Sequence, residues 1–445
     1  FASGESQYEL NVEGGLARGR FARNRFQGQE GNQGPYKLRG ANGEQFIIII
    51  SGSERVYIDG VLQKRGEQFD YIIDYNAGEI TFTALQPITR DKRIVVEFQY
   101  TEQNFLRSVV QGSLAWEKAN WQSEVRYYSE QDSKDQPIST DYSDQEKALL
   151  ASVGDNLDAA RSNTIRSAAF DPSLVQYRLV DSLGFDSVLV FSTDSNVALY
   201  NASFSYLGSN QGDYQLAQSN ANGRVFKWVA PLNGVPQGSY APLKSLIAPN
   251  RLQVLAYSSR GTWGTKNRQS LAVEGAFSNN QLNLFSDRDR SNDDGAAAKF
   301  DYRLRRNFAK GELELKTAYE FNNPGFITLE RIRPVEFARD WNLPFSYQGA
   351  LQTGEVGLSY RRDSLQVAYG AEFLNSPLKP GWRQSLKSDW QAQRWLGSAK
   401  ASLTETKGLG LEESFWREQV STRYYWLPEA WIGLASVGEW NQKRL

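Results

Sequence analysis

The sequence of 445 residues contains no cysteine, no histidine and no methionine. Without cysteine the chain has no disulfide, no thiolate nucleophile and no thiolate ligand for zinc. Without histidine it lacks the side chain that most often acts as a general base near neutral pH and that most often binds metals. We therefore expect a protein that is not an enzyme and that carries no cofactor or metal.

Net charge and long apolar runs are also lacking. The chain has 50 Lys and Arg residues against 51 Asp and Glu residues, so it does not carry the positive field that nucleic-acid binding requires. No window approaches the about 18 consecutive apolar residues of a transmembrane helix. The chain begins at Phe1 without an apolar leader, so we expect a processed form or a part of a longer protein.

Aromatic residues, by contrast, are abundant. They make up 13% of the chain, yet the mean hydropathy is polar at -0.56. A transmembrane β-barrel combines these properties, because its strands present aromatic side chains to lipid and charged side chains to a hydrated interior. The composition therefore favours an all-β fold built on a transmembrane antiparallel β-barrel.

Apolar and polar residues alternate along much of the chain, as expected for β-strands with two different faces. The clearest pair of strands lies near residues 298–305 and 312–321. The candidate lipid-facing residues are Phe300, Tyr302, Leu304, Leu313, Leu315 and Tyr319. The candidate pore-lining residues are Lys299, Asp301, Arg303, Arg305, Glu312, Glu314 and Lys316.

The spacing of these strands is that of an outer-membrane barrel. Each strand is expected to have about 9 to 11 residues, enough to cross a bilayer when tilted. From a turn at Asn279-Asn280 onward, short and long connections alternate, as in outer-membrane barrels. The longest connection in this part, 322–353, contains the pair Arg339-Asp340 and Trp341, and we expect it to be ordered and to fold over or into the pore. The pattern predicts about thirteen strands; because this count is odd, we expect further strands.

The stretch from Ser53 to Thr83 predicts a small domain of stacked hairpins. Asp59-Gly60 is a strong two-residue hairpin signal, and Asn76-Ala77-Gly78 marks a second turn. The acidic residues Asp59, Asp70 and Asp74 do not follow the spacing of a calcium loop. In the charged segment 286–295, arginines compensate the aspartates, so we interpret it as a solvated loop.

Three segments resemble parts of very large, mostly uncharacterised outer-membrane proteins of Bacteroidota. They are "GPYKLRGANGEQFIIIISGSERVYIDGVLQKRGEQFDYIIDYNAGEITFT" (34–83), "GDYQLAQSNANGRVFKWVAPLNGVPQGSYAP" (212–242) and "ERIRPVEFARDWNL" (330–343). The resemblance implies a large barrel with attached β-domains at the cell surface or in the periplasm, and it brings no known active residues.

These observations predict five regions. They are an N-terminal strand and loop segment (1–35), a hairpin-rich β-domain (36–104), barrel strands (105–129), a β-rich insertion (130–251) and barrel strands with alternating short turns and long loops (252–445).

The predicted protein lies in the outer membrane of a Gram-negative bacterium. It serves as a conduit or an assembly and translocation platform for polar cargo, by geometry rather than catalysis. Its expected partners are outer-membrane lipids and surface lipoproteins or other outer-membrane or periplasmic proteins, with no nucleic acid. The alternative is a non-pore surface adhesin or scaffold, which would be soluble without detergent.

Overall fold

The structure is a computed structural model. It describes residues 6–17, 19–41, 44, 47–101, 105–138, 141–220 (219 and 220 by backbone only), 223–264, 268–344, 347, 349–408 and 410–444. Strands make up 61% of the chain and helices 5%, which confirms the all-β class. None of the helices formed by these residues is long and apolar enough to cross a membrane. The chain divides into two units, the second of which comprises Thr140–Pro249 and Leu282–Asp289.

The first unit contains an antiparallel sheet of thirteen strands. In spatial order these are β1 (Gln7–Ala17), β10 (Phe105–Lys118), β11 (Trp121–Pro137), β22 (Arg251–Trp263), β23 (Gln269–Gln281), β24 (Asp294–Phe308), β25 (Gly311–Asn322), β26 (Leu351–Arg362), β27 (Leu365–Asn375), β28 (Gly381–Ala392), β29 (Trp395–Gly408), β30 (Leu411–Leu427) and β31 (Ala430–Arg444). They have 11 to 17 residues each, so all except β1 and β27 are longer than expected. Among the described residues the sheet does not close into a barrel, because β1 pairs only with β10 and β31 only with β30.

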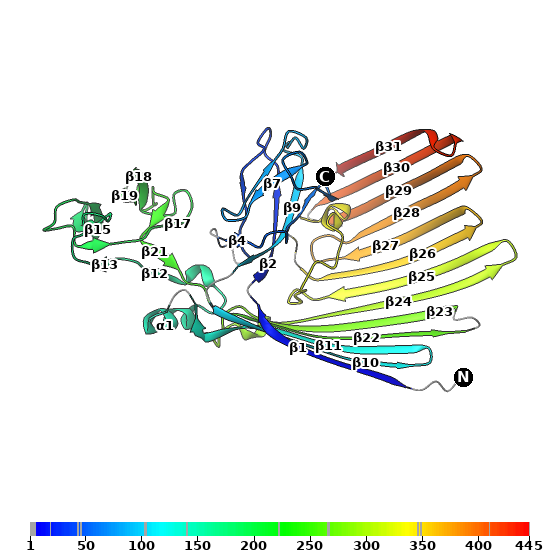
Figure 1. Cartoon of the computed structure of the whole chain (residues 1–445), viewed down its shortest axis with the longest axis horizontal. Helices are drawn as coiled ribbons and strands as arrows, with labels where there is room; N and C mark the ends of the chain where they lie inside the picture. The colour runs from blue at the N-terminus through cyan, green and yellow to red at the C-terminus, as the bar shows by residue number, and fades with distance from the viewer. Residues whose placement is uncertain are drawn as a thin grey trace. The chain divides into compact units, whose positions relative to one another are not determined.

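Connections of two to five residues join the strands at one end of the sheet (Figure 1). At the other end the connections have very different lengths, from two residues between β29 and β30 and five between β27 and β28 to 28 between β25 and β26, so the predicted alternation of short and long connections is wrong at 404–413. The predicted turn at Asn279-Asn280 is wrong, because both residues lie within β23. Asn279 pairs with Gln253 on one side and Asp294 on the other, and its side chain donates to Asp294 Oδ1 over 2.8 Å. Partners on the neighbouring strands thus hold the Asn-Asn pair in a strand, although this pair on its own would favour a turn. The hairpin connection lies instead between β22 and β23.

A small β-domain is inserted between β1 and β10. It contains one sheet in the order β2 (Gly19–Gln27), β9 (Arg93–Thr101), β5 (Arg55–Ile58) and β6 (Val61–Leu62), with β4 (Ile48–Ile49) also paired to β9. Its second sheet has the order β3 (Tyr36–Lys37), β8 (Glu79–Phe82) and β7 (Tyr71–Asp74). We call β2 to β9 the β2–β9 domain.

The two predicted hairpins of this domain are present. Ile58 pairs with Val61 across Asp59-Gly60, where both turn residues have positive φ angles of 50° and 81°. This backbone conformation favours glycine and asparagine or aspartate. A continuous buried cluster that includes Val56, Ile80 and Phe98 fills the domain, so burial of alternate strand residues explains why it folds.

The second unit has its own secondary structure. Helix α1 (Asp144–Val153) begins at Ser143, whose hydroxyl accepts from Glu146 N while the Glu146 side chain accepts from Ser143 N. The sequence analysis did not predict this helix, although this capping pair was a visible signal. Burial disfavours the charged Glu146 carboxylate, but hydrogen bonds from Lys244 and Ser143 outweigh that effect and lower its pKa to about 2.

Two four-stranded sheets form the remaining core of this unit. The first has the order β13 (Arg166–Ser167), β16 (Tyr200–Asn201), β14 (Tyr177–Ser182), β15 (Phe185–Phe191). The second has the order β17 (Ser205–Tyr206), β20 (Tyr240–Ala241), β18 (Tyr214–Asn220), β19 (Gly223–Trp228), and the short strands β12 (Arg161–Asn163) and β21 (Leu243–Ser245) pair separately. Phe204 stacks on Phe226 with ring centroids 4.4 Å apart, and the Tyr177 hydroxyl accepts from Phe226 N over 3.1 Å. Aromatic packing and satisfied hydroxyl groups thus stabilise this unit.

Candidate functional site: the two faces of the large sheet

Strands β24 and β25 carry all of the candidate residues from the sequence analysis. Their register pairs Arg303 with Lys316 and Phe300 with Tyr319. Because side chains alternate between the faces of a sheet, the seven charged candidates lie on one face, which we call the polar face. The six apolar candidates lie on the opposite face, which we call the apolar face.

The apolar face is exposed over the breadth of the sheet. The exposed fraction of the side chain is 46% for Phe300 and 38% for Tyr319. Exposed apolar residues at corresponding positions on other strands are Leu114, Val125, Leu255, Leu358, Tyr369, Leu386 and Val420. A soluble monomer rarely leaves so broad an apolar surface in contact with water, so this face requires a different environment.

Aromatic side chains concentrate towards both ends of the strands on the apolar face. Towards the short turns lie Trp121, Trp263, Tyr360, Trp390, Trp395 and Tyr424; towards the long connections lie Phe277, Tyr319, Phe373, Trp382 and Trp416. Trp382 and Trp390 are eight residues apart on β28, about 27 Å along a strand and about 20 Å across a bilayer after a typical tilt. Two aromatic girdles around an apolar band of about 25 Å are typical of outer-membrane barrels.

The connection between β25 and β26, which we call the 323–350 loop, packs against the polar face near the long-connection end. Its short helix α2 (Phe337–Asp340) is followed by Trp341, whose exposed fraction is only 2%. Asp340 lies 3.1 Å from Arg417 on β30 and 3.7 Å from Arg383 on β28. The loop expected to fold over or into a pore thus packs on the face that carries the charged candidates; its residues Phe345, Ser346 and Gln348 lie outside the described residues.

The Asp340 carboxylate is held in a protein environment rather than in water. Burial raises its pKa, although the positive charges of Arg417 and Arg383 act in the opposite direction. The neighbouring Arg339 forms an ion pair with Glu439 on β31. The loop is thus attached to three strands of the polar face by charged side chains.

A cavity of about 320 Å³ lies between the loop and the sheet. Lys299, Asp301 and Lys316, three of the predicted pore-lining residues, contribute to its lining. Lys316 is 2.7 Å from Glu355, and Lys299 is 3.3 Å from Asp301, so the charges of these lining residues are paired. The other four candidates lie outside this lining, towards the short turns, where Arg305 pairs with Glu314.

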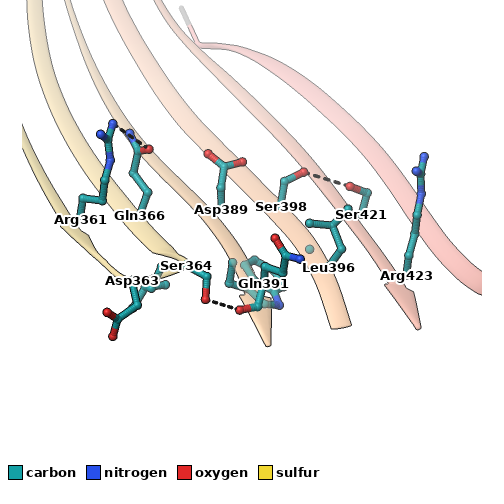
Figure 2. A pocket seen from close by; sticks show the side chains of 13 residues that line it. Arg361, Asp363, Ser364, Gln366, Asp389, Gln391, Leu396, Ser398, Ser421 and Arg423 are labelled. Carbon is teal, nitrogen blue, oxygen red and sulfur yellow. Dashed lines mark hydrogen bonds between the residues drawn. The ribbon is translucent and has the colours of Figure 1, made fainter. Parts of the chain in front are cut away.

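A second polar surface lies near the short turns. Figure 2 shows Arg361, Gln366, Asp389, Ser398 and Ser421, which lie opposite one another in a row across five strands. Ser398 and Ser421 share a hydrogen bond of 2.9 Å. These residues border a pocket of about 500 Å³. The polar face thus remains hydrophilic along the length of the strands.

The 323–350 loop also contacts the β2–β9 domain. Arg331 is 2.9 Å from Glu97 on β9, and Glu336 is 2.8 Å from Arg93 at the start of the same strand. The domain is inserted between β1 and β10, far away in sequence. The loop therefore connects the β2–β9 domain to the polar face.

Charged side chains of the polar face form ion pairs with one another, such as Arg305 with Glu314 and Lys316 with Glu355. Among the residues that the structure describes, no group of three or more acidic side chains could hold a metal ion. The three aspartates weighed as calcium ligands have other partners: Asp59 pairs with Lys92 at 3.1 Å, Asp70 accepts from Lys64 N, and Asp74 accepts from turn amides. The arrangement can exclude apolar molecules and hold polar ones through mixed charges.

Sequence reasoning missed the charged residues that hold the loop. Arg383 and Arg417 are the clearest examples, and Glu372 pairs with Arg383 at 2.6 Å. Each alternates with apolar neighbours on its strand, so the period-two pattern was a usable signal. The long-range pairing with Asp340 was not visible in the sequence.

In the comparison with known proteins, a family model matches the β2–β9 domain. Residues 21–102 match a family described as a domain of unknown function (DUF8818), which is nearly the extent of β2 to β9. No curated protein and no solved structure matches the chain.

Proposed function

We propose that the large sheet is part of the wall of an outer-membrane β-barrel in a Gram-negative bacterium. The apolar face contacts lipid, and the polar face lines a hydrated interior that serves as a conduit or an assembly and translocation platform for polar cargo. The resemblance to large outer-membrane proteins of Bacteroidota is part of this proposal. Surface lipoproteins or other envelope proteins are the proposed partners of the attached domains.

The observation that carries the proposal is the exposed apolar face with aromatic side chains towards both of its ends. In an adhesin or scaffold dissolved in water, a packed protein layer would be needed over this face. Hydrocarbon chains satisfy the same face without a protein layer, and they explain why tryptophan and tyrosine gather where headgroups would lie.

The direction of the strands determines whether an odd or an even number of further strands would close the proposed barrel. In a sheet of thirteen antiparallel strands, the first and last strands run in the same direction, so β1 and β31 cannot pair with each other in an antiparallel manner. An odd number of further strands between them would restore antiparallel pairing around a closed barrel. A second copy in the same membrane orientation cannot supply this, because its β1 would run parallel to β31.

The 323–350 loop gives the interior a constriction. It occupies the polar face near the long-connection end and is held there by Asp340 and Trp341. Mixed charges along the remaining face favour passage or docking of polar cargo over selection of one ion. In this proposal the loop narrows the path and connects it to the β2–β9 domain.

Quenching of tryptophan fluorescence by brominated lipids tests the membrane location. The full chain is reconstituted into vesicles with and without bromine on the acyl chains. We expect strong quenching that falls in Trp382→Phe, because this ring lies on the apolar face, and that does not fall in Trp341→Phe, because this loop residue is buried on the side of the polar face. Equal fluorescence in both kinds of vesicle, or a chain that remains in the aqueous fraction without detergent, would show that the proposal is wrong.

A further inference from the structure

Glu418 on β30 is an ionisable residue within the apolar face of the large sheet. It lies opposite Ala401 on β29, which in turn lies opposite Leu386 on β28. Because residues that pair across neighbouring strands share a face and Leu386 belongs to the apolar face, Glu418 belongs to it as well. Its neighbours on this face of β30 are Trp416 and Val420, both exposed. A carboxylate thus lies between two exposed apolar side chains.

The position of Glu418 differs from that of the other ionisable residues of the apolar face. Among the described residues of the sheet, the others lie level with the aromatic side chains near the strand ends or beyond them; Glu405, for example, lies opposite Trp382. Glu418 is two residues from Trp416 and six from Tyr424 on its own strand, which is about 7 Å and about 20 Å along the strand. In the proposed barrel its carboxylate therefore lies inside the hydrocarbon band.

In the part of the chain that the structure describes, the Glu418 carboxylate forms no ion pair and accepts no hydrogen bond. Trp416 and Trp440, which pair with each other on β30 and β31, lie between Glu418 and the nearer end of the strands. The short glutamate side chain is therefore separated from that end by two tryptophan residues. A carboxylate inside a hydrocarbon layer is unfavourable unless a basic side chain or another donor contacts it. A basic side chain from a neighbouring molecule would remove this cost.

Small residues surround Glu418 and leave space above its side chain. Ala401 and Gly438 lie directly opposite it on the two neighbouring strands, and Ala399 and Ser436 lie in the next row. A Cβ atom at position 438 would come within 3.2 Å of Glu418 Cγ, so a larger residue than glycine would crowd the carboxylate. Such small residues allow another protein segment to approach closely. We call these five residues the β29–β31 patch.

We propose that the β29–β31 patch binds the lipid-facing side of another outer-membrane β-barrel protein, which places a lysine or arginine side chain against Glu418. Charge complementarity selects this partner, because a basic side chain neutralises the carboxylate within the membrane. A second copy of this chain, related by a two-fold axis at the patch, would instead bring two Glu418 carboxylates together. This inference rests on the proposed function, since it requires the apolar face to lie in the membrane.

Photo-crosslinking in the cells that naturally produce the protein tests this interface. The full chain carries the photoreactive residue p-benzoylphenylalanine in place of Val420, beside Glu418, or in place of Tyr369, which lies on the apolar face of β27. We expect a discrete protein cross-link from position 420 and only lipid adducts from position 369. Mass spectrometry of the cross-link from position 420 should identify a peptide of another protein in which a lysine or arginine is flanked by alternating apolar residues.

Charge reversal tests whether Glu418 makes the contact. Glu418→Lys should lower the yield of the cross-link from position 420 by about tenfold or more, because like charges repel across an interface. Replacement of the basic residue of the identified peptide by glutamate should restore the yield with Glu418→Lys. The matched control is Glu405→Lys, the same change on the apolar face but level with Trp382, and it should leave the yield unchanged.

A second variant and an internal control keep the test decisive. Glu418→Gln removes the charge alone and should also lower the yield, so the test does not depend on the folding of the lysine variant. Lipid adducts from position 369 show that each variant has entered the membrane. Only lipid adducts from position 420, a cross-link to a second copy of this chain, or equal yields in Glu418→Lys and Glu405→Lys would overturn the inference and leave the proposed membrane location intact. The absence of lipid adducts from both positions would instead contradict the membrane location itself.

Discussion

If the apolar face contacts lipid, as proposed, replacement of Leu386 by arginine should destabilise the protein strongly. Leu386 lies on the apolar face of β28 with an exposed fraction of 51%, midway between Trp382 and Trp390. Each tryptophan is four residues away, about 13 Å along the strand, which places Leu386 near the middle of the lipid-facing band. An arginine at the bilayer midplane costs about 2–4 kcal/mol in transmembrane barrels, so we expect Leu386→Arg to lower the free energy of unfolding by that amount.

The control for this prediction is the adjacent residue on the other face. Ser385→Arg introduces the same side chain on the polar face, where it faces water, and should change the free energy of unfolding by about 0.5 kcal/mol or less. Ser388→Arg stays on the apolar face but lies only two residues from Trp390, so its cost should be smaller than that of Leu386→Arg. The measurement is reversible unfolding in urea from lipid vesicles, followed by tryptophan fluorescence.

The dependence of the arginine cost on depth in the bilayer tests the lipid-facing assignment. If the apolar face packed against another protein layer, arginine at positions 386 and 388 would cost similar amounts, because burial in protein has no midplane. Equal costs at these two positions, or equal costs at 385 and 386, would contradict a lipid-facing assignment.

Three further predictions concern buried side chains. Asp132→Ala removes the carboxylate that lies 2.7 Å from the buried Arg107 guanidinium and should lower the free energy of unfolding by about 3–5 kcal/mol. The exposed Asp135→Ala should change the free energy of unfolding little when both variants are unfolded in urea. Glu146 has a folded pKa of about 2 against an ordinary 4.5, so its contribution is fully present above about pH 4.5 and is lost as the pH falls through 2. Glu146→Gln should destabilise the second unit by about 2 kcal/mol at pH 7 and by much less at pH 2, and an equal deficit at both pH values would contradict the ion pair with Lys244. Trp341→Ala should weaken loop packing by about 3–5 kcal/mol and speed tryptic cleavage within the 323–350 loop, while Trp382→Ala on the apolar face should leave that cleavage rate unchanged.

Local patterning accounted for the parts of the fold that depend on neighbouring residues. The alternation around Phe300 and Tyr319 placed charged and apolar side chains on opposite faces, because the period of a strand is fixed by its pleat. The turn at Asp59-Gly60 followed from the backbone angles that these residues tolerate.

The errors arose where distant partners decide the conformation. Asn279-Asn280 is a good turn sequence, yet β22 and β24 supply hydrogen-bonding partners on both of its sides. Attachment of the loop through Asp340 depends on strands up to about a hundred residues further along the chain. The contact of Arg331 with Glu97 joins the 323–350 loop to β9, and no local pattern links these segments.

The shared direction of β1 and β31 bears on how such a wall would be assembled. Two edge strands of opposite direction could pair as soon as the sheet had curved far enough, and the barrel would then close too early. In the proposed barrel the two edge strands run in the same direction, so they would stay unpaired until further strands were placed between them. An odd number of strands would thus delay closure of the barrel. Until closure, an unpaired edge strand could pair with a wrong partner.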